Sequence, residues 1–389
     1  MPVVRLRGSG RKQGNLTMRS GPLHRVKIVE FAGIGPTPFA AMMLADMGAD
    51  VIRIDRPGGA KVSAGDITLD VLNRGRRSIA LDLKDGESAA LARSLCDKAD
   101  VVLEGFRPGV MERLGFCPAE LHATNPALVF ARMTGWGQHG AFADKAGHDI
   151  NYIAMSGALS LVGEAGKPPP PPINFFADFG GGATFVVIGI LAALVERGAS
   201  GEGQIIDAAM VDGSALLTAQ IHAWRAMGFW SDRRSDNLLD GAAYFYRCYE
   251  CADGEYLAVG AIEPQFHAAF VEGLDLPLGE FGNHLDRSTW PERSARVATV
   301  VATRRRDEWV ERFAALDACV SPVLTIAEAV AHPANRDRAL FGTVGGVEQP
   351  MPAPRFDRTP AAVTGAPRQL GADGDAIRAR LATSADWPD

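Results

Sequence analysis

Short apolar runs alternate with longer Ala- and Leu-rich segments along the first 226 residues. The runs favour strands at 26–31, 49–55, 78–83, 101–104, 128–134 and 204–211. The segments between and after them favour helices at 39–47, 86–99, 109–114, 150–161, 183–196 and 212–226. Because strands that alternate with helices usually form a parallel sheet covered by helices, the pattern predicts an α/β fold.

A run of five prolines, 168–172, interrupts this alternation. Proline excludes both a helix interior and a paired central strand, so the run predicts a stiff extended connector leading towards Asp178. The helix expected at 183–196 is the most apolar in the chain. We expect it to be buried, with Gly198 as its stop.

The pattern changes after about residue 239. The runs 244–251 and 255–260, separated by Asp253-Gly254, predict a β-hairpin. Helices are expected at 264–272, 291–302 and 306–316, and the chain is loop-rich after Pro333. The predicted organisation is a large domain at 26–225, a linker at 226–240, a smaller α/β domain at 241–330 and a segment at 331–389 that returns to the large domain.

Composition narrows the class of protein. The 389 residues carry a net charge of -6, and the basic residues are dispersed, so no nucleic-acid partner is expected. The longest apolar run, 185–195, is shorter than the roughly 20 residues that cross a bilayer, so no membrane contact is expected either. Five irregularly spaced cysteines suggest free thiols in a reducing compartment, and a cytoplasmic location is the default. Residues 1–25 are basic, lack an apolar period and predict a disordered extension, in which Met18 is a possible alternative start.

Gly33-x-Gly35 after the first strand, with Asp55 at the end of the next, imitates a dinucleotide fingerprint. The position of the third glycine is occupied by Pro38, and Pro36 is expected in the loop. Nicotinamide binding is therefore the less favoured interpretation, and a structural turn is preferred. Scattered histidines and a single Cys-x-x-Cys, Cys248 and Cys251, predict no metal site.

Two segments carry candidate chemistry. His148 lies between Gly147 and Asp149, and Asp178 precedes three glycines and the apolar helix. Each residue alone has an ordinary explanation, His148 as a structural histidine and Asp178 as a helix N-cap. Together they offer an imidazole and a carboxylate, which suit proton transfer beside a carbonyl. At a helix start, Asp178 should be held as a carboxylate by the helix field.

The chain from 26 to about 356 resembles the family III CoA transferases and, within them, the α-methylacyl-CoA racemases. The segments that carry the resemblance are 30–36, 48–57, 104–109, 134–138, 146–152, 178–182 and 260–266. The resemblance implies an intertwined homodimer with a Rossmann-like large domain and a smaller domain in each subunit. The active site would lie between the large domain of one subunit and the small domain of the other.

The resemblance also implies a binding site for an acyl-CoA substrate and no separate cofactor. The residues carried over to it are Arg56, Leu81, Asp82, Leu83, Lys84, Gly105, Phe106, Arg107, Arg113, Gly147, Asp149, Ile150, Asn151 and Tyr152. The arginines and the lysine suit phosphate groups, and a guanidinium can stack on adenine. Taken singly, Lys84 and Arg113 are as readily explained as surface charges.

Racemase and transferase differ at two places in the resemblance. A transferase would use Asp178 as a nucleophile to form a mixed anhydride, under a glycine-rich loop of the small domain. Here that loop contains Glu263, and His148 is present, and both features match the racemases. The implied reaction is epimerisation at C2 of a 2-methylacyl-CoA, by proton transfer through an enolate between His148 and Asp178. Glu263 would orient His148, although a helix-start acid before Pro264 explains it equally well.

Overall fold

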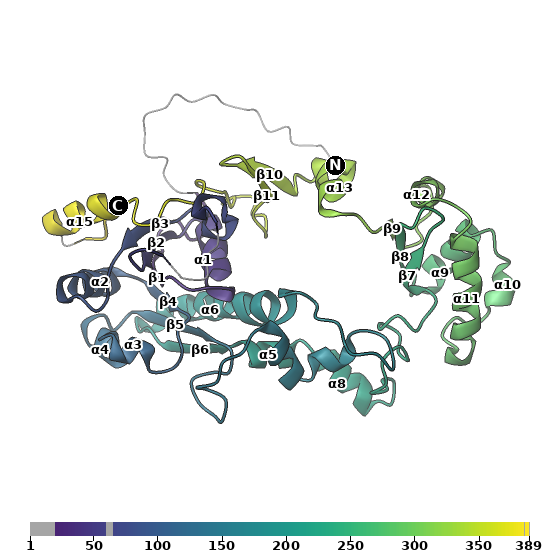
Figure 1. Cartoon of the computed structure of the whole chain (residues 1–389), viewed down its shortest axis with the longest axis horizontal. Coiled ribbons are helices and arrows are strands. Elements are labelled where there is room, and N and C mark those ends of the chain that lie inside the picture. The colour runs from purple at the N-terminus through teal and green to yellow at the C-terminus, as the bar shows by residue number, and fades with distance from the viewer. Residues whose placement is uncertain (1–19, 60–64, 385, 389) are drawn as a thin grey trace.

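The computed structural model describes residues 20–59, 65–384 and 386–388. Its chain forms a large unit, built on a six-stranded sheet, and a small unit, built on a three-stranded sheet (Figure 1). Segments on either side of the small unit connect it to the large unit (Figure 1). The sheets confirm the predicted α/β class, while the exact domain boundaries stay a prediction.

The sheet of the large unit is entirely parallel, with strand order β3-β2-β1-β4-β5-β6. This is the doubly wound order in which the chain reverses direction between β1 and β4. Every residue of β4 and β5 is buried, as expected for strands covered on both faces. The strands are β1 (Lys27–Phe31), β2 (Asp50–Asp55), β3 (Arg77–Ala80), β4 (Val101–Glu104), β5 (Val129–Thr134) and β6 (Ile205–Ala209).

Helices cover both faces of this sheet. One apolar core joins the sheet to α1, α5, α6 and α7, and the other joins it to α2, α3, α4 and α15. Among these, Leu44 of α1 and Leu95 of α2 are fully buried on opposite faces. The bounds are α1 (Pro36–Asp46), α2 (Gly86–Lys98), α3 (Val110–Arg113), α4 (Pro118–Thr124), α5 (Asp149–Met155), α6 (Thr184–Ser200), α7 (Met210–Leu216), α8 (Ala219–Ala226) and α15 (Gly374–Thr383).

The first turn differs from the prediction. Helix α1 begins at Pro36 rather than at residue 39, with Gly35 as its N-cap at φ 69°. Proline fits the first helical position because its fixed φ is helical and its missing N–H has no acceptor there. Pro36 therefore starts the helix instead of lying in the loop.

The apolar helix is longer than predicted. A π-helix, η4 (Phe175–Ala183), runs directly into α6, which ends at Ser200 with Gly201 as its left-handed cap. Gly198 is therefore not the stop. Ile188 and Val195 are 53% and 77% exposed, so the expectation of a buried helix is wrong for a single copy of the chain.

The continuous segment Phe175–Ser200 is also long and apolar enough to cross a membrane, by length and composition alone. Its first part packs on α7 and its second part on β5 and β6. These contacts are those of a helix that covers a sheet, so the segment is part of the large unit.

The small unit contains the predicted hairpin. Strands β7 (Tyr246–Glu250) and β8 (Tyr256–Gly260) pair antiparallel, and β9 (Val320–Pro322) adds to β8. Its core includes Tyr244, Phe270 and Trp309, all at most 1% exposed. Its helices are α9 (Pro264–Gly273), α10 (Leu278–Phe281), α11 (Trp290–Val301) and α12 (Arg306–Phe313).

The chain then returns to the large unit. After α13 (Ile326–Ala331) and α14 (Pro333–Asp337) comes an unpredicted hairpin, β10 (Phe341–Val344) and β11 (Val347–Pro350). Buried Arg74 ties this hairpin down, because it donates to Asp46 at 2.6 Å and to Gln349 at 2.9 Å. Helix α15 was also missed by the sequence analysis. Short 3-10 helices lie at η1 (Ile67–Leu69), η2 (Val71–Asn73), η3 (Ala158–Leu161) and η5 (Arg287–Thr289).

The expected N-terminal extension is ordered where it is described. Residues 20–25 form turns, Leu23 is 9% exposed within the core, and its N–H donates to Met47. Disorder is therefore the wrong expectation for 20–25, because an apolar anchor holds them. The rest of the expected extension, 1–19, lies outside the described residues.

Candidate active site

Asp178 lies inside a helix rather than at its start. It occupies the first turns of η4, whose N-cap is Asn174, and its side chain is half-buried. The side-chain amide of Asn174 donates to Oδ2 of Asp178 at 3.4 Å. The expectation that Asp178 caps a helix is therefore wrong, because the irregular π-turns extend the helix upstream of it.

The backbone of Asp178 is held by Asp149. Oδ2 of Asp149 accepts from the N–H of Ala177 at 2.7 Å and from the N–H of Asp178 at 2.8 Å. Asp149 is only 5% exposed, and its Oδ1 has no hydrogen-bond partner among the described residues. A buried carboxylate thus fixes the main chain from which the Asp178 side chain projects.

The pKa of Asp178 is raised above its ordinary value. Burial is the largest cause and the negative charge of Asp149 is the second, while the Asn174 amide and the His148 imidazole act in the opposite direction. Desolvation and a like charge therefore outweigh any lowering of the Asp178 pKa by the helix field. A carboxyl with a raised pKa exchanges protons more readily near neutral pH.

His148 is the N-cap of α5 and is exposed. Its backbone N–H donates to the side-chain oxygen of Asn151 at 3.0 Å, which fixes the turn. The effect of His148 on the pKa of Asp178 places the imidazole near the carboxyl, so the structure brings these two predicted residues together.

Tyr152 lies between the His148 segment and Asp178. Its hydroxyl donates to the carbonyl of Gly147 at 2.5 Å, and a side chain at Gly135 would clash with its ring, at 2.2 Å. Both glycines are needed because the tyrosine ring fills the space beside the backbone. Burial and the charge of Asp178 raise the pKa of Tyr152 to about 12, and Arg107 opposes them, so all three groups are neighbours.

The turn after β1 faces Asp178. A Cβ on Gly35 would lie 3.3 Å from Oδ2 of Asp178, and Gly35 has a positive φ of 69°. Phe39 of α1 stacks on Phe179 with ring centroids 4.3 Å apart. The Gly33-x-Gly35 turn therefore lies beside the reactive carboxyl. Gly35 and Asn174 were not predicted as site residues, although Asn174 stands four residues before Asp178, at helical spacing.

The predicted CoA residues follow the carboxyl ends of neighbouring parallel strands. Arg56 follows β2, Leu81 to Lys84 follow β3, and Gly105 to Arg107 follow β4. Such ends meet at one edge of the sheet, where ligands of this fold class bind. Arg56, Lys84, Arg107 and Arg113 are exposed, whereas Leu81 is 2% exposed and packs in the core.

A buried ion network shapes the segment after β4. Glu104, fully buried, accepts from the N–H of Phe106 at 2.7 Å and from Arg132 at 2.8 Å. Arg132 also contacts Glu112 of α3 at 2.7 Å. Burial raises the pKa of Glu104, against the opposing effect of Arg132. The network fixes the loop 105–109 between β4 and α3.

Glu263 is not near His148 in a single chain. It is the exposed N-cap of α9 in the small unit, and its side chain does not cap that helix. No hydrogen bond or ion pair between Glu263 and His148 occurs among residues 20–59, 65–384 and 386–388.

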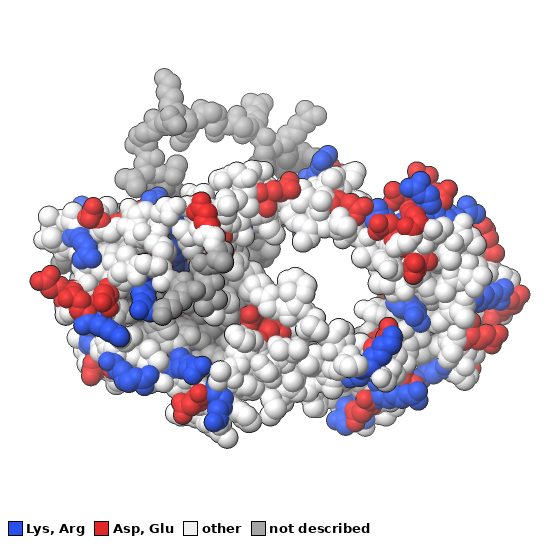
Figure 2. Space-filling view, viewed as in Figure 1, with Lys and Arg blue, Asp and Glu red and all other residues white. Residues whose placement is uncertain are grey.

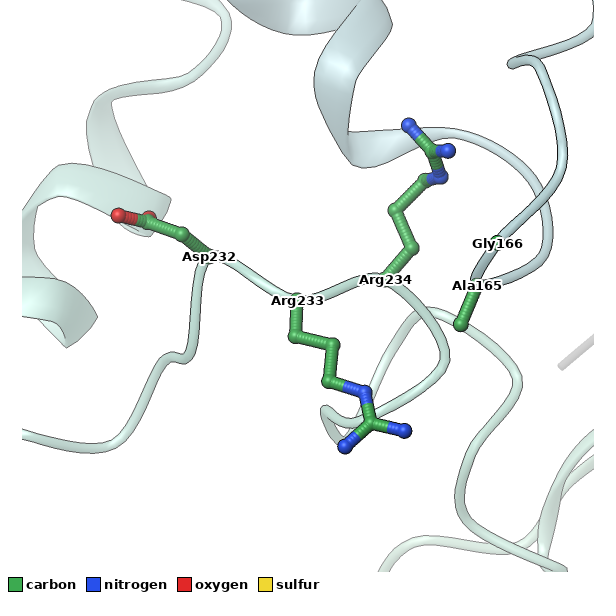
Figure 3. A pocket seen from close by; sticks show the side chains of 5 residues that line it. All are labelled: Ala165, Gly166, Asp232, Arg233 and Arg234. Atoms are coloured by element: carbon green, nitrogen blue, oxygen red, sulfur yellow. The ribbon is translucent and has the colours of Figure 1, made fainter.

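A hollow of about 440 Å³ lies elsewhere, at the connecting loops, and is lined by Ala165, Gly166, Asp232, Arg233 and Arg234 (Figure 3). Arg234 donates to the carbonyls of Glu164 and Lys167, at 3.2 and 2.5 Å, so it ties the two loops together. In Figure 3 Arg233 points away from Arg234. None of the catalytic or CoA-binding residues predicted from the sequence lines this hollow. Within the described ranges, no cluster of three metal-ligating side chains occurs.

Comparison with known proteins identifies the family and the overall fold. The family model for CoA-transferase family III matches residues 23–374. The chain is 48% identical to the α-methylacyl-CoA racemase of Mus musculus and 46% identical to that of Homo sapiens, each over 340 residues covering 87% of both chains. The crystal structure of a CAIB/BAIF family protein from Brucella suis superposes with a TM-score of 0.80 at 27% identity, over 93% of this chain and 100% of that one.

Proposed function

The chain belongs to the CoA-transferase family III, and we propose that it acts as an α-methylacyl-CoA racemase, an isomerase that inverts C2 of 2-methylacyl-CoA thioesters. The observation that carries the proposal is the pairing of Asp178, whose pKa is raised, with the exposed imidazole of His148, which acts electrostatically on that carboxyl. The 48% and 46% identity to two proteins named as such racemases supports it.

The proposed mechanism uses the two groups as opposite bases. A thioester acidifies the hydrogen on C2, and one of His148 and Asp178 removes it while the other protonates the opposite face of the enolate. The roles exchange with the direction of reaction. N–H groups in the first turn of α5, at Asp149 and Ile150, lack intrahelical acceptors and are suited to stabilise the enolate oxygen.

The CoA portion would lie along the carboxyl edge of the large sheet. Arg56, Lys84, Arg107 and Arg113 are exposed there and are suited to neutralise its phosphates. Gly105 has no room for a side chain, because a Cβ would lie 2.3 Å from Thr37. CoA is part of the substrate, and the mechanism needs no further cofactor.

The functional unit would be an intertwined homodimer, in which Glu263 of one subunit reaches His148 of the other. Two observations support this. The space-filling view has an opening between the large and small units (Figure 2). Several large apolar side chains, which a second copy would cover, are exposed in a single chain: Ile188, Val195, Leu216, Met227 and Phe229, each at least 53% exposed.

The direct test uses one epimer of a 2-methylacyl-CoA in deuterated water, followed by proton NMR. A racemase replaces the C2 hydrogen with deuterium and produces both epimers without any second substrate. The alternative, a CoA transferase with Asp178 as nucleophile, would need an acceptor acid and would leave C2 unexchanged. Acyl transfer without exchange would overturn the proposal.

A further inference from the structure

A pair of buried histidines lies directly behind the segment that carries Glu263. His267 of α9 and His284 of the loop 282–286 are 3% and 7% exposed. Their rings stack with centroids 4.5 Å apart and an interplanar angle of 14°. Phe245 packs edge-on against both, at 6.0 and 5.0 Å. We call His267 and His284 the imidazole pair.

Each histidine of the pair holds one residue of the Glu263 segment. Nε2 of His284 lies 2.8 Å from the carbonyl oxygen of Ile262. Because a carbonyl only accepts, Nε2 must carry the hydrogen. The backbone N–H of His267 donates to the carbonyl of Glu263 at 2.9 Å. The ring of His284 and the backbone N–H of His267 therefore fix the carbonyls on both sides of the Glu263 Cα atom.

The backbone N–H groups of the preceding residues, Ala261 and Ile262, already have acceptors in the small unit. Ala261 N–H donates to Phe245 at 2.8 Å, and Ile262 N–H donates to Gly260 at 3.0 Å. The Ile262 carbonyl has His284 as its donor. Pro264 follows at the first position of α9 with a restricted φ. The direction of the exposed Glu263 side chain thus depends on the bond from His284.

The surroundings keep His284 in place. Its own carbonyl accepts from Nε1 of Trp290 at 2.8 Å, and Nε2 of its stacking partner His267 lies 2.5 Å from the Tyr244 hydroxyl. Burial, the neighbouring His284 and Arg293 lower the pKa of His267 to about 4. His267 is therefore neutral at pH 7, and the stacked pair avoids two adjacent positive charges.

We infer that His284 is a positioning residue: through the Ile262 carbonyl it sets the direction in which Glu263 leaves the small unit to meet His148 of the other subunit. This inference rests on the proposed racemase function, to which it adds a residue that touches neither substrate nor His148. It acts on turnover through Glu263 alone.

The test compares two replacements of His284 in the full-length protein. His284→Met keeps the bulk but removes the donor, and should lower kcat for C2 exchange about five- to tenfold with KM for the acyl-CoA within about twofold. His284→Gln places an amide N–H near the same carbonyl and should restore most of kcat. In a Glu263→Gln background, His284→Met should cause no further loss, because both changes act through one side chain.

Trp309→Phe is the matched control. Nε1 of Trp309 also donates from a buried ring to a backbone carbonyl of the small unit, that of Val301 at 2.9 Å, and its helix α12 does not carry Glu263. This variant should lose thermal stability while keeping kcat. A His284→Met enzyme with wild-type kcat, or one whose loss persists fully in the Glu263→Gln background, would overturn the inference.

Amide hydrogen exchange separates this inference from the proposed function. His284→Met should speed exchange at the amides of Ile262 and His267, and Trp309→Phe should not. If the wild-type protein exchanges no C2 hydrogen, the proposed function fails, and unchanged protection of these two amides would then reject the role of His284 independently.

Discussion

Replacing Asp149 separates the charge of its carboxylate from its hydrogen bonds. Oδ2 accepts two backbone N–H groups, from Ala177 and Asp178, and the same charge raises the pKa of Asp178. Asp149→Ala removes both effects. Asp149→Asn keeps an acceptor oxygen for both N–H groups and puts its amide nitrogen where the unpartnered Oδ1 now lies.

The stability cost follows from these two bonds. A buried hydrogen bond to a charged group contributes about 1.5–3 kcal/mol, and a neutral one about half as much. Asp149→Ala should therefore lower the free energy of unfolding by about 3–6 kcal/mol, and Asp149→Asn by about 1.5–3 kcal/mol. Urea unfolding measures both. Asp85→Ala is the control, because Asp85 caps α2 through a bond to the Ser88 N–H at 2.9 Å on an exposed surface, and its loss should lower the free energy of unfolding less than Asp149→Ala does.

Replacing Asp149 should also shift the pH dependence of catalysis in a known direction. In the direction in which Asp178 is the base, kcat/KM falls as the pH drops through its pKa. Asp149→Asn removes the like charge, so the pKa of Asp178 should fall and the acidic limb should move to lower pH. C2 deuterium exchange measured from pH 4 to 9 gives this limb. A limb that stays in place or moves to higher pH would refute the assigned electrostatics, and Asp85→Ala should leave it unchanged.

Three further predictions concern the two bases, the shared site and the small unit. Asp178→Asn and His148→Gln should each nearly abolish epimerisation. Each variant should still exchange the C2 hydrogen of one epimer only, which proton NMR in deuterated water measures. Racemisation at the wild-type rate by either variant would remove that residue from the mechanism. Mixing inactive Asp178→Asn and Glu263→Gln chains under refolding conditions should restore activity, because one composite site is then intact, and heterodimers without activity would disprove a shared site. The pKa of His267 is about 4 when folded against 6.5 when free, so the unfolded chain binds more protons between these values and stability should fall by up to about 3 kcal/mol as the pH drops from 7 to 4. Unfolding of His267→Gln should lack this component, and an equal pH slope in both proteins would contradict it.

The sequence determined the elements whose pattern is local. Strand and helix alternation identified the parallel sheet, because a buried strand needs an apolar run and a covering helix needs a 3.6-residue period. The hairpin of β7 and β8 followed from Asp253-Gly254 between two strand-like runs. His148 and Asp178 were singled out by the order of short motifs; the imidazole acts electrostatically on the carboxyl, and the catalytic roles of the two residues stay a prediction.

Tertiary structure alone decided the rest. The raised pKa of Asp178 depends on burial and on Asp149, 29 residues away in sequence, so no local pattern could reveal it. The β10–β11 hairpin depends on Arg74, which lies 275 residues before its partner Gln349. The apolar face of α6 was expected in the core but is exposed at Val195. Periodicity records that a residue is apolar, whereas only the packing of distant segments, and of further copies of the chain, decides what covers it.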